Sequence, residues 1–170
     1  MSDERHPLPA LDRRAADAMW ADYARASPAT VRASAEYTVE AFGDSVELAD
    51  ALLAEVLHGS KRATAELVDA HIADGDALPR VGSHWVVCDG TGAPRLILRS
   101  IELRIGTFSS VDAQFAYDEG EDDRTLESWQ REHRRYWQRT CAARGTVFSE
   151  ESDEIMLERF RVVWPPEHAD

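Results

Sequence analysis

Residues 59–67 read Gly-Ser-Lys-Arg-Ala-Thr-Ala-Glu-Leu, and the spacing of apolar residues changes at this stretch. Before it, over residues 46–57, apolar side chains recur every three or four positions, which predicts an amphipathic helix. From residue 62 to residue 67, polar and small apolar residues alternate, which is typical of a half-buried strand. We expect this strand to bury Ala63, Ala65 and Leu67 and to turn Arg62, Thr64 and Glu66 toward a polar surface or cleft.

The ends of the predicted helix carry recognisable signals. Asp44, with Glu47 three residues later, has the spacing of an N-terminal capping box. Gly59 is suited to the C-terminal cap. We therefore expect the helix to begin just after Asp44 and to end just before Gly59.

The remaining elements alternate irregularly along the chain. Apolar spacing predicts a helix over 11–26, stopped by Pro28, and further helices over 110–119 and 125–144. Strands are predicted at 84–89 and 94–105, joined by a turn at 89–92, and at 154–164. This order indicates an α+β fold: a small, partly closed mixed β-barrel with helices packed around it, plus an N-terminal helix. An open sheet fits the pattern equally well. The expected organisation is a flexible tail at 1–8, a helical extension at 9–36 and one domain at 37–166.

Composition sets the broad class. The 170 residues, 44% hydrophobic and 30% charged, are typical of one globular domain that needs no metal or disulfide to fold. We expect no membrane association, because no apolar run is long enough to span a bilayer and no apolar signal segment opens the chain. Cys88 and Cys141 stand in no known motif, so we expect two reduced thiols and a cytoplasmic protein.

The net charge of −13 argues against a protein that coats nucleic acid through its overall field, and we expect no DNA binding. Within this acidic chain, 18 of the 19 basic residues are arginine, and Lys61 is the only lysine. A buried lysine can lose its proton, which arginine cannot, so Lys61 is a candidate for a role that arginine cannot fill. Chance retention explains a single lysine equally well.

Residues 124–144 carry a net positive charge, whereas the chain as a whole is acidic. They hold six arginines and two glutamates, a local net charge of +4. Such a helix face is suited to a few phosphates, with Tyr136 or Trp137 available to stack on a base. The alternative is a solvated face held by pairs such as Glu127–Arg131, with Trp129 and Trp137 in the core.

Motifs for other chemistries are missing from the sequence. No Cys-x-x-Cys or His-Glu-x-x-His spacing indicates zinc, and no Gly-rich phosphate loop or Gly-x-Ser-x-Gly elbow occurs. We therefore expect neither a metal nor a cofactor.

Several ordered blocks between Val39 and Val163 are similar to a known family. They are Phe42–Asp44, Glu47–Asp50, Gly59–Ala65, Phe115–Glu121, Asp123–Trp129 with His133, and Glu158–Phe160. They resemble the ASCH domain family, related to the PUA-like RNA-binding barrels, and within it the larger bacterial branch. The resemblance assigns residues 37–166 to the ASCH domain.

The resemblance implies a barrel with a cleft that contains the Lys61 segment and the acidic segment around Glu119. One smaller member of the family is an amidohydrolase that removes the acetyl group from N4-acetylcytidine, and its catalytic residues fall on Lys61, Thr64 and Glu119. Another member is a ribonuclease, and others are thought only to bind RNA. The family usually has threonine directly after the motif lysine, where this chain has Arg62. A fixed cation there is expected to alter substrate choice.

Amide hydrolysis needs a nucleophile, a proton acceptor and a stabiliser of the oxyanion. Lys61 would activate the Thr64 hydroxyl if burial or a nearby cation lowered its proton affinity. If Glu119 pairs tightly with Lys61, the lysine stays charged and acts instead as an electrophile. The sequence leaves both roles open.

We therefore predict an amidohydrolase acting on an N4-acylated cytidine-like substrate, with Lys61, Thr64 and Glu119 as catalytic residues. The alternatives are a non-catalytic RNA-binding module and a ribonuclease that use the same cleft. The expected partner is a small nucleoside-like ligand or single-stranded RNA; the oligomeric state is not predicted. The candidate ligand-binding residues are Arg62, Glu66, Tyr117, Arg124, Arg131 and Arg135.

Overall fold

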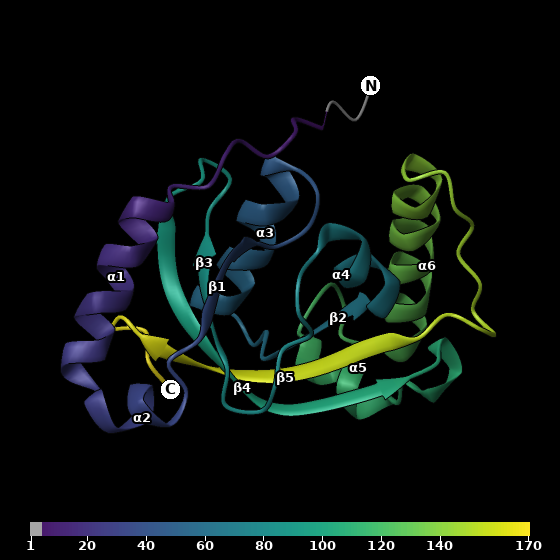
Figure 1. Ribbon diagram of the computed structural model, residues 1–170. Coiled ribbons are helices and arrows are strands. Elements are labelled where there is room, and N and C mark those ends of the chain that lie inside the picture. Colours follow the sequence, from purple (N-terminus) through teal and green to yellow (C-terminus); the bar gives the residue numbers. More distant parts are fainter. Residues whose placement is uncertain (1–4) are drawn as a thin grey trace. The chain divides into compact units, whose positions relative to one another are not determined.

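The structure is a computed structural model, and it describes residues 5–170 (Figure 1). Its strands are β1 (Tyr37–Ala41), β2 (Ala63–Leu67), β3 (His84–Cys88), β4 (Pro94–Gly106) and β5 (Ile155–Trp164). Over the described residues they pair in the order β1-β3-β4-β5-β2, with β1 parallel to β3 and with antiparallel β3–β4 and β2–β5 pairs. The predicted α+β fold, a small mixed sheet of the half-barrel kind with helices around it, is confirmed.

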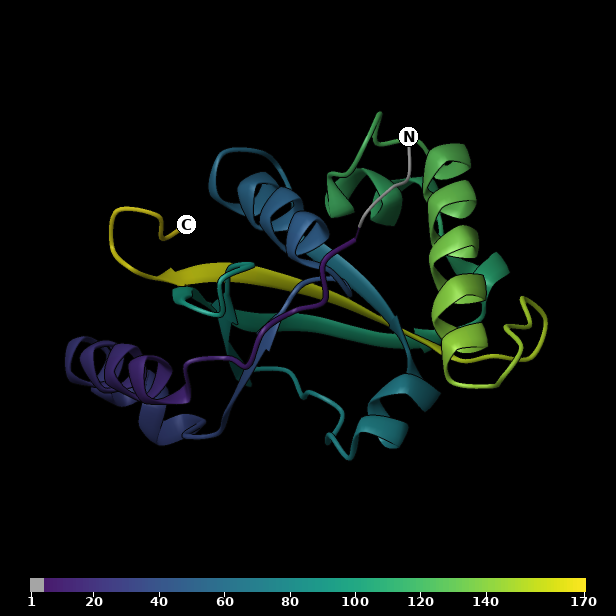
Figure 2. The same ribbon diagram turned by 90° about the horizontal axis from the view of Figure 1, so that it is seen from above.

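The chain divides into two compact units, and the long strands β4 and β5 run through both. The first unit contains the residues through Gly59, Val81–Ile101 and Phe160–Asp170, and the second contains Ser60–Arg80 and Glu102–Arg159. Figure 2 shows β4 and β5 side by side, as their adjacent places in the strand order require.

The first unit contains the helices α1 (Arg13–Ala26), α2 (Pro28–Ala33) and α3 (Val46–Leu57). Ala16 and Tyr23 of α1 are buried in a cluster with residues of β1, β3 and β4. The Tyr23 hydroxyl is 3.2 Å from Nε2 of the buried His84. The N-terminal helix is therefore part of a packed core. Of the expected tail, residues 1–4 lie outside the described residues, and the backbone carbonyl of His6 accepts a hydrogen bond from Val46 N.

The second unit contains the helices α4 (Val68–Asp74), η1 (Phe108–Ser110), α5 (Ala113–Glu119) and α6 (Leu126–Ala143). Helix α5 packs against β2 and α6 (Figures 1 and 2). The apolar face of β2 and the two tryptophans of α6 share one core, which lies under the candidate site. Trp129 and Trp137 of α6 are buried, as one of the two alternatives for residues 124–144 expects, and His133 and Cys141 are buried on the same helix.

Of two predictions at helix ends, one is confirmed and one was wrong. The helix predicted over 11–26 ends at Ala26, before Pro28, and Pro28 then opens α2, because proline suits the first turn of a helix, where its missing N–H is not needed. The N-cap of α3 is Ser45, whose hydroxyl accepts a hydrogen bond from Leu48 N, and not Asp44. The helix therefore begins one residue later than the Asp44–Glu47 spacing indicated.

Three elements were missed or merged at the sequence level. The stretch that forms β1 was assigned no element, and α4 was not predicted after the strand β2. The predicted helix over 110–119 is split into η1 and α5, because the Asp112 carboxylate caps α5 by accepting from Phe115 N. Elements this short contain too few apolar residues to show the spacing that is typical of a helix or a strand.

Within residues 5–170, no helix is both long enough and apolar enough to cross a membrane. Cys88 and Cys141 are both buried and form no disulfide. Burial, with the charge of Asp89 beside it, raises the pKa of the Cys88 thiol to about 11, so this thiol is unreactive at neutral pH.

Candidate functional site

The side chain of Lys61, the only lysine of the chain, is completely buried in the second unit. Its Nζ donates to the backbone carbonyl of Ala63, 2.9 Å away, and to Oε1 of Glu121, 2.5 Å away. Oε1 of Glu119 lies 3.7 Å from the same nitrogen. A buried ammonium is tolerated only where opposite charges and hydrogen bonds replace water, and two carboxylates do so here.

A close backbone approach brings the acidic segment to Lys61. Gly120 follows the last residue of α5 with a φ of +72°, and a Cβ placed on it would lie 2.6 Å from Lys61 N and 2.8 Å from Lys61 Cα. Arg62 N donates to the carbonyl of Asp118, 2.8 Å away, and Arg159 of β5 binds the Asp118 carboxylate. Only glycine fits at position 120, because the site needs both the positive φ and the close approach.

Glu119 connects the lysine to helix α6. Its side chain is 1% exposed, and its Oε2 accepts a hydrogen bond from Nε1 of Trp129. Nε2 of His133 lies 3.3 Å from Oε1 of Glu119. His133 is held in place because its Nδ1 donates to the Trp129 carbonyl at 3.0 Å and its ring stacks on that of Trp129. One buried carboxylate thus contacts two cationic side chains and an indole.

The pKa values of Glu119 and His133 move in opposite directions. Burial alone raises the pKa of Glu119, but the charges of His133 and Lys61, with hydrogen bonds from His133 and Trp129, hold it below its ordinary value. Burial alone lowers the pKa of His133, but the charge and hydrogen bond of Glu119 raise it above its ordinary value. Each group of the pair therefore favours the charged form of the other.

This pair sets a pH window for stability. His133, whose folded pKa is raised, contributes stability that is fully present below about pH 6.5 and is lost as the pH rises through the folded pKa. Glu119, whose folded pKa is lowered, contributes stability that is present above about pH 4.5 and is lost as the pH falls through the folded pKa. Both contributions are intact between these limits.

Thr64 and Glu66 lie on the half-buried face of β2. Thr64 directly follows the Ala63 carbonyl that the Lys61 ammonium binds, and it pairs in register with Glu158 of β5. Glu66 is held by Trp137, whose Nε1 lies 3.1 Å from its Oε1, and by the backbone N–H of Leu67. Burial raises the pKa of Glu66 against these hydrogen bonds. The Lys61–Glu119–His133 contacts are built without the Thr64 hydroxyl.

Of the other predicted ligand residues, Arg62 is next to Lys61 in the sequence, and Tyr117 and Arg124 flank the acidic segment at 118–123. Arg62 donates from Nη1 to the carbonyl of Lys61 at 2.8 Å. Tyr117 is 51% exposed, and the Arg124 guanidinium lies over its ring. Arg131 and Arg135 belong instead to the outer face of α6.

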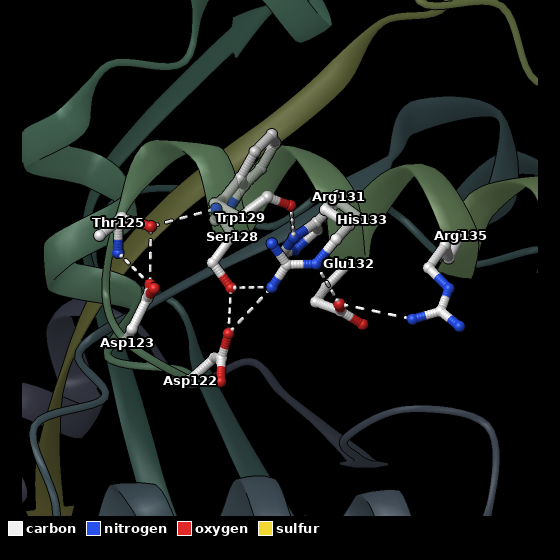
Figure 3. Close-up of polar contacts among 9 residues, drawn as sticks. All are labelled: Asp122, Asp123, Thr125, Ser128, Trp129, Arg131, Glu132, His133 and Arg135. Carbon is white, nitrogen blue, oxygen red and sulfur yellow. Dashed lines mark hydrogen bonds and ion pairs between the residues drawn. The ribbon is translucent and has the colours of Figure 1, made fainter.

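Two arginines of α6, Arg131 and Arg135, contact carboxylates (Figure 3). Arg131 binds the carboxylates of Asp122 at 3.2 Å and Glu132 at 2.9 Å, and it also donates to the Ser128 hydroxyl. Arg135 lies 3.6 Å from Glu132. Asp122 and Glu132, and not Glu127, are the carboxylates that these two arginines contact. Beyond the residues drawn, Arg134 pairs with Glu150 and Arg144 with Asp74. The local charge of +4 is thus largely compensated.

Two residues of the cluster were missed as site candidates at the sequence level. His133 belonged to a family-like block, but no pattern within α6 indicates that its ring meets Glu119. The resemblance placed the Glu-Gly-Glu segment in the cleft, but Glu121 was given no role there. Its spacing from Glu119 matters because a glycine with positive φ between the two acids lets both approach one cation. Among residues 5–170, no three histidine, cysteine or acidic side chains gather as a metal site.

A family model and a solved structure both relate this chain to the ASCH domain. The sequence model of the ASCH domain matches residues 38–164. The crystal structure of an ASCH domain from Lactobacillus crispatus JV V101 is similar with a TM-score of 0.80 and 27% identity, over 91% of this chain and 97% of that one. Protein EF3133 from Enterococcus faecalis V583, of the family DUF984, has a TM-score of 0.67 and 30% identity, over 74% of this chain and 76% of that one. No curated protein matches the sequence.

The approach of Gly120 to Lys61 yields a first prediction. Gly120→Ala should lower the free energy of unfolding by at least about 2 kcal/mol more than Gly75→Ala, measured by urea denaturation. Gly75 is a matched control because it also ends a helix with a positive φ, of +76°, yet a Cβ there meets nothing within 4 Å. Gly75→Ala therefore carries only the backbone cost of about 1 kcal/mol. Equal losses for the two variants would contradict the close packing at Lys61.

The two buried histidines yield a second prediction. In an NMR titration of the imidazole signals, His133 should titrate above 6.5, whereas His84 should titrate at about 4, because burial and the charge of Arg99 lower its pKa. Glu119→Gln should lower the His133 pKa and leave that of His84 unchanged, so His84 serves as the internal control. A His133 pKa below 6.5 in the unmodified protein would rule out the ion pair.

Proposed function

Because the chain belongs to the ASCH domain family, whose fold is PUA-like, and because its only lysine is buried between two carboxylates, we propose that the Lys61 site binds a nucleoside-like ligand and hydrolyses an amide on it. The substrate class is an N4-acylated cytidine or a related acylated pyrimidine. Water is consumed, and the products are a carboxylic acid and the free amine. The observation that carries the proposal is the Nζ of Lys61, 2.5 Å from Glu121 and isolated from bulk solvent.

In this proposal Lys61 acts as a cation and not as a base. An ammonium that already donates to Glu121 and to the Ala63 carbonyl has no electron pair with which to accept a proton. It is suited to donate to the acyl oxygen as negative charge develops there, and such a contact is strong in a site that excludes water. Of the two roles left open by the sequence, the geometry favours the electrophile.

Thr64 and Glu119 supply the remaining steps of the proposed reaction. The Thr64 hydroxyl, or a water molecule bound to it, attacks the acyl carbon from the half-buried face of β2. The carboxylate of Glu119 receives the proton and returns it to the amine as the C–N bond breaks. Where the hydroxyl itself attacks, this step leaves an ester on Thr64. A water molecule then attacks the ester, Glu119 passes the proton of that water to the Thr64 oxygen, and the carboxylic acid is released. His133 holds Glu119 ionised between turnovers, because its imidazolium stabilises the carboxylate.

A small ligand fits this protein better than a long polyanion. The net charge is −13, and the α6 arginines that would attract a phosphate chain are engaged with Asp122, Glu132 and Glu150. Binding of a neutral nucleoside should depend little on salt, whereas RNA retention should fall steeply with it. We place the activity in the cytoplasm, where the two buried cysteines remain thiols.

The Thr64 hydroxyl tests the proposed activity without disturbing the ion pairs of Lys61. Thr64→Val keeps the side-chain shape and removes the hydroxyl, so kcat/KM on N4-acetylcytidine should fall at least about 100-fold. The reaction is measured as the loss of the acylcytosine absorbance. Thr64→Ser keeps the hydroxyl and should stay within about tenfold of the parent. Lys61→Met should also be inactive, but it leaves Glu119 and Glu121 uncompensated and is expected to be less stable.

The result that would overturn the proposal is an inactive parent protein. If the parent turns over neither N4-acetylcytidine nor N4-acetylated RNA, yet retains single-stranded RNA in a salt-sensitive way, the protein is a non-catalytic RNA-binding module. If it shortens that RNA, the activity is that of a ribonuclease. Equal activity of Thr64→Val and the parent would remove Thr64 from the reaction.

A further inference from the structure

Tyr117 and Arg124 form an exposed pair at the two ends of the acidic segment. Tyr117, near the end of α5, is 51% exposed, and Cζ of Arg124 lies 3.5 Å from the centroid of its ring. The Nε of Arg124 donates to the Tyr117 carbonyl at 3.0 Å. The ring and the carbonyl together fix the plane of the guanidinium, which is the part of arginine that recognises oxyanions.

The backbone that carries this arginine is strained. Asp122 and Arg124 have φ values of +48° and +64°, a region that residues with a side chain rarely occupy. Such conformations cost free energy and persist where the surrounding structure holds them, which is often at functional sites. Here Arg124 N donates to the Glu121 carbonyl at 2.9 Å, and this turn keeps Arg124 over Tyr117.

Arg124 also differs from most of the arginines that follow it. Arg131, Arg134 and Arg135 of α6 and Arg144 just after it each contact a carboxylate, whereas Arg139 lies over the ring of Tyr136. Within residues 5–170, the contacts of Arg124 are with a carbonyl oxygen and an aromatic ring, and none is with a carboxylate. In a chain of net charge −13, this guanidinium keeps its charge available for an anion.

Glu121 links this arginine to the Lys61 site. Its side chain binds the Lys61 ammonium at 2.5 Å, and its backbone carbonyl accepts from Arg124 N at 2.9 Å. Both contacts belong to the same unit of the chain. A ligand that reaches the partly exposed Glu121 from solvent therefore arrives beside the Tyr117–Arg124 pair.

We propose that Arg124, held by Tyr117, binds a phosphate group carried by the ligand of the Lys61 site. The preferred ligand is then a nucleoside phosphate, either a mononucleotide or a nucleotide within RNA, which binds more tightly than the free nucleoside. A planar guanidinium donates two parallel hydrogen bonds to phosphate oxygens, and charge-assisted bonds of this kind are the strong ones. This inference rests on the proposed function, because it takes a nucleoside-like ligand at Lys61 as its premise.

Calorimetry with product-like ligands tests the phosphate site apart from any hydrolysis. Cytidine, cytidine 5′-monophosphate, cytidine 3′-monophosphate and a cytidine-containing RNA pentamer are titrated into the unmodified protein, Arg124→Gln and Arg104→Gln. Arg104 is a matched control because it lies in the same unit and also donates to a backbone carbonyl, that of Ser110.

At least one phosphorylated ligand should bind the unmodified protein about tenfold or more tightly than cytidine does. In Arg124→Gln this advantage should disappear, and in Arg104→Gln it should remain. An advantage limited to a monophosphate identifies a mononucleotide as the ligand, whereas one limited to the pentamer identifies RNA. The advantage should also shrink as the salt concentration rises, because it depends on one exposed ion pair.

Two results would overturn the inference: equal affinity of the unmodified protein for cytidine and for every phosphorylated ligand, or an advantage that survives in Arg124→Gln. Failure of the proposed function gives a different result. A protein that hydrolyses no acylated substrate but loses its phosphate advantage in Arg124→Gln keeps the phosphate site and lacks the amidohydrolase activity.

Discussion

The buried ammonium of Lys61 is the constraint on which the rest of the site depends. An unpaired charge of this kind is too costly to bury, so the surrounding chain must bring carboxylates to it and must keep them ionised. Glu119 and Glu121 meet the first need, and His133 meets the second by pairing with Glu119. Each carboxylate of the cluster thus lies within ion-pair distance of a basic side chain.

This pairing explains local features that otherwise look unrelated. Gly120 has a positive φ and no side chain because two acids on either side of it must approach one cation. His133 lies on the inner face of α6, stacked on Trp129, because its ring must reach Glu119. The same charges decide the chemistry: a lysine paired in this way is suited to stabilise an oxyanion and not to remove a proton.

Regular elements with a full amphipathic period were predictable from the sequence, whereas contacts between distant segments were not. The alternation in β2 and the inner face of α6 agree with the structure, because each depends on a period that one segment carries by itself. The stretch that forms β1 was not recognised, since its pairing with β3 is a long-range contact. The family-like blocks brought Lys61 and Glu119 together as candidates, and the structure puts them 3.7 Å apart. His133 and Glu121 belonged to these blocks but were given no role, because no pattern within one segment indicates which charge a buried side chain meets.

The most direct measurement of the central claim is acylation of the only lysine by an amine-reactive ester, followed by mass spectrometry of the peptide that contains Lys61. The account predicts that Lys61 stays unmodified in the folded protein at neutral pH and reacts at once when urea unfolds the chain, because its Nζ is enclosed by Glu121, Glu119 and the Ala63 carbonyl. Reaction of Lys61 at the same rate in the folded and the unfolded protein would contradict it.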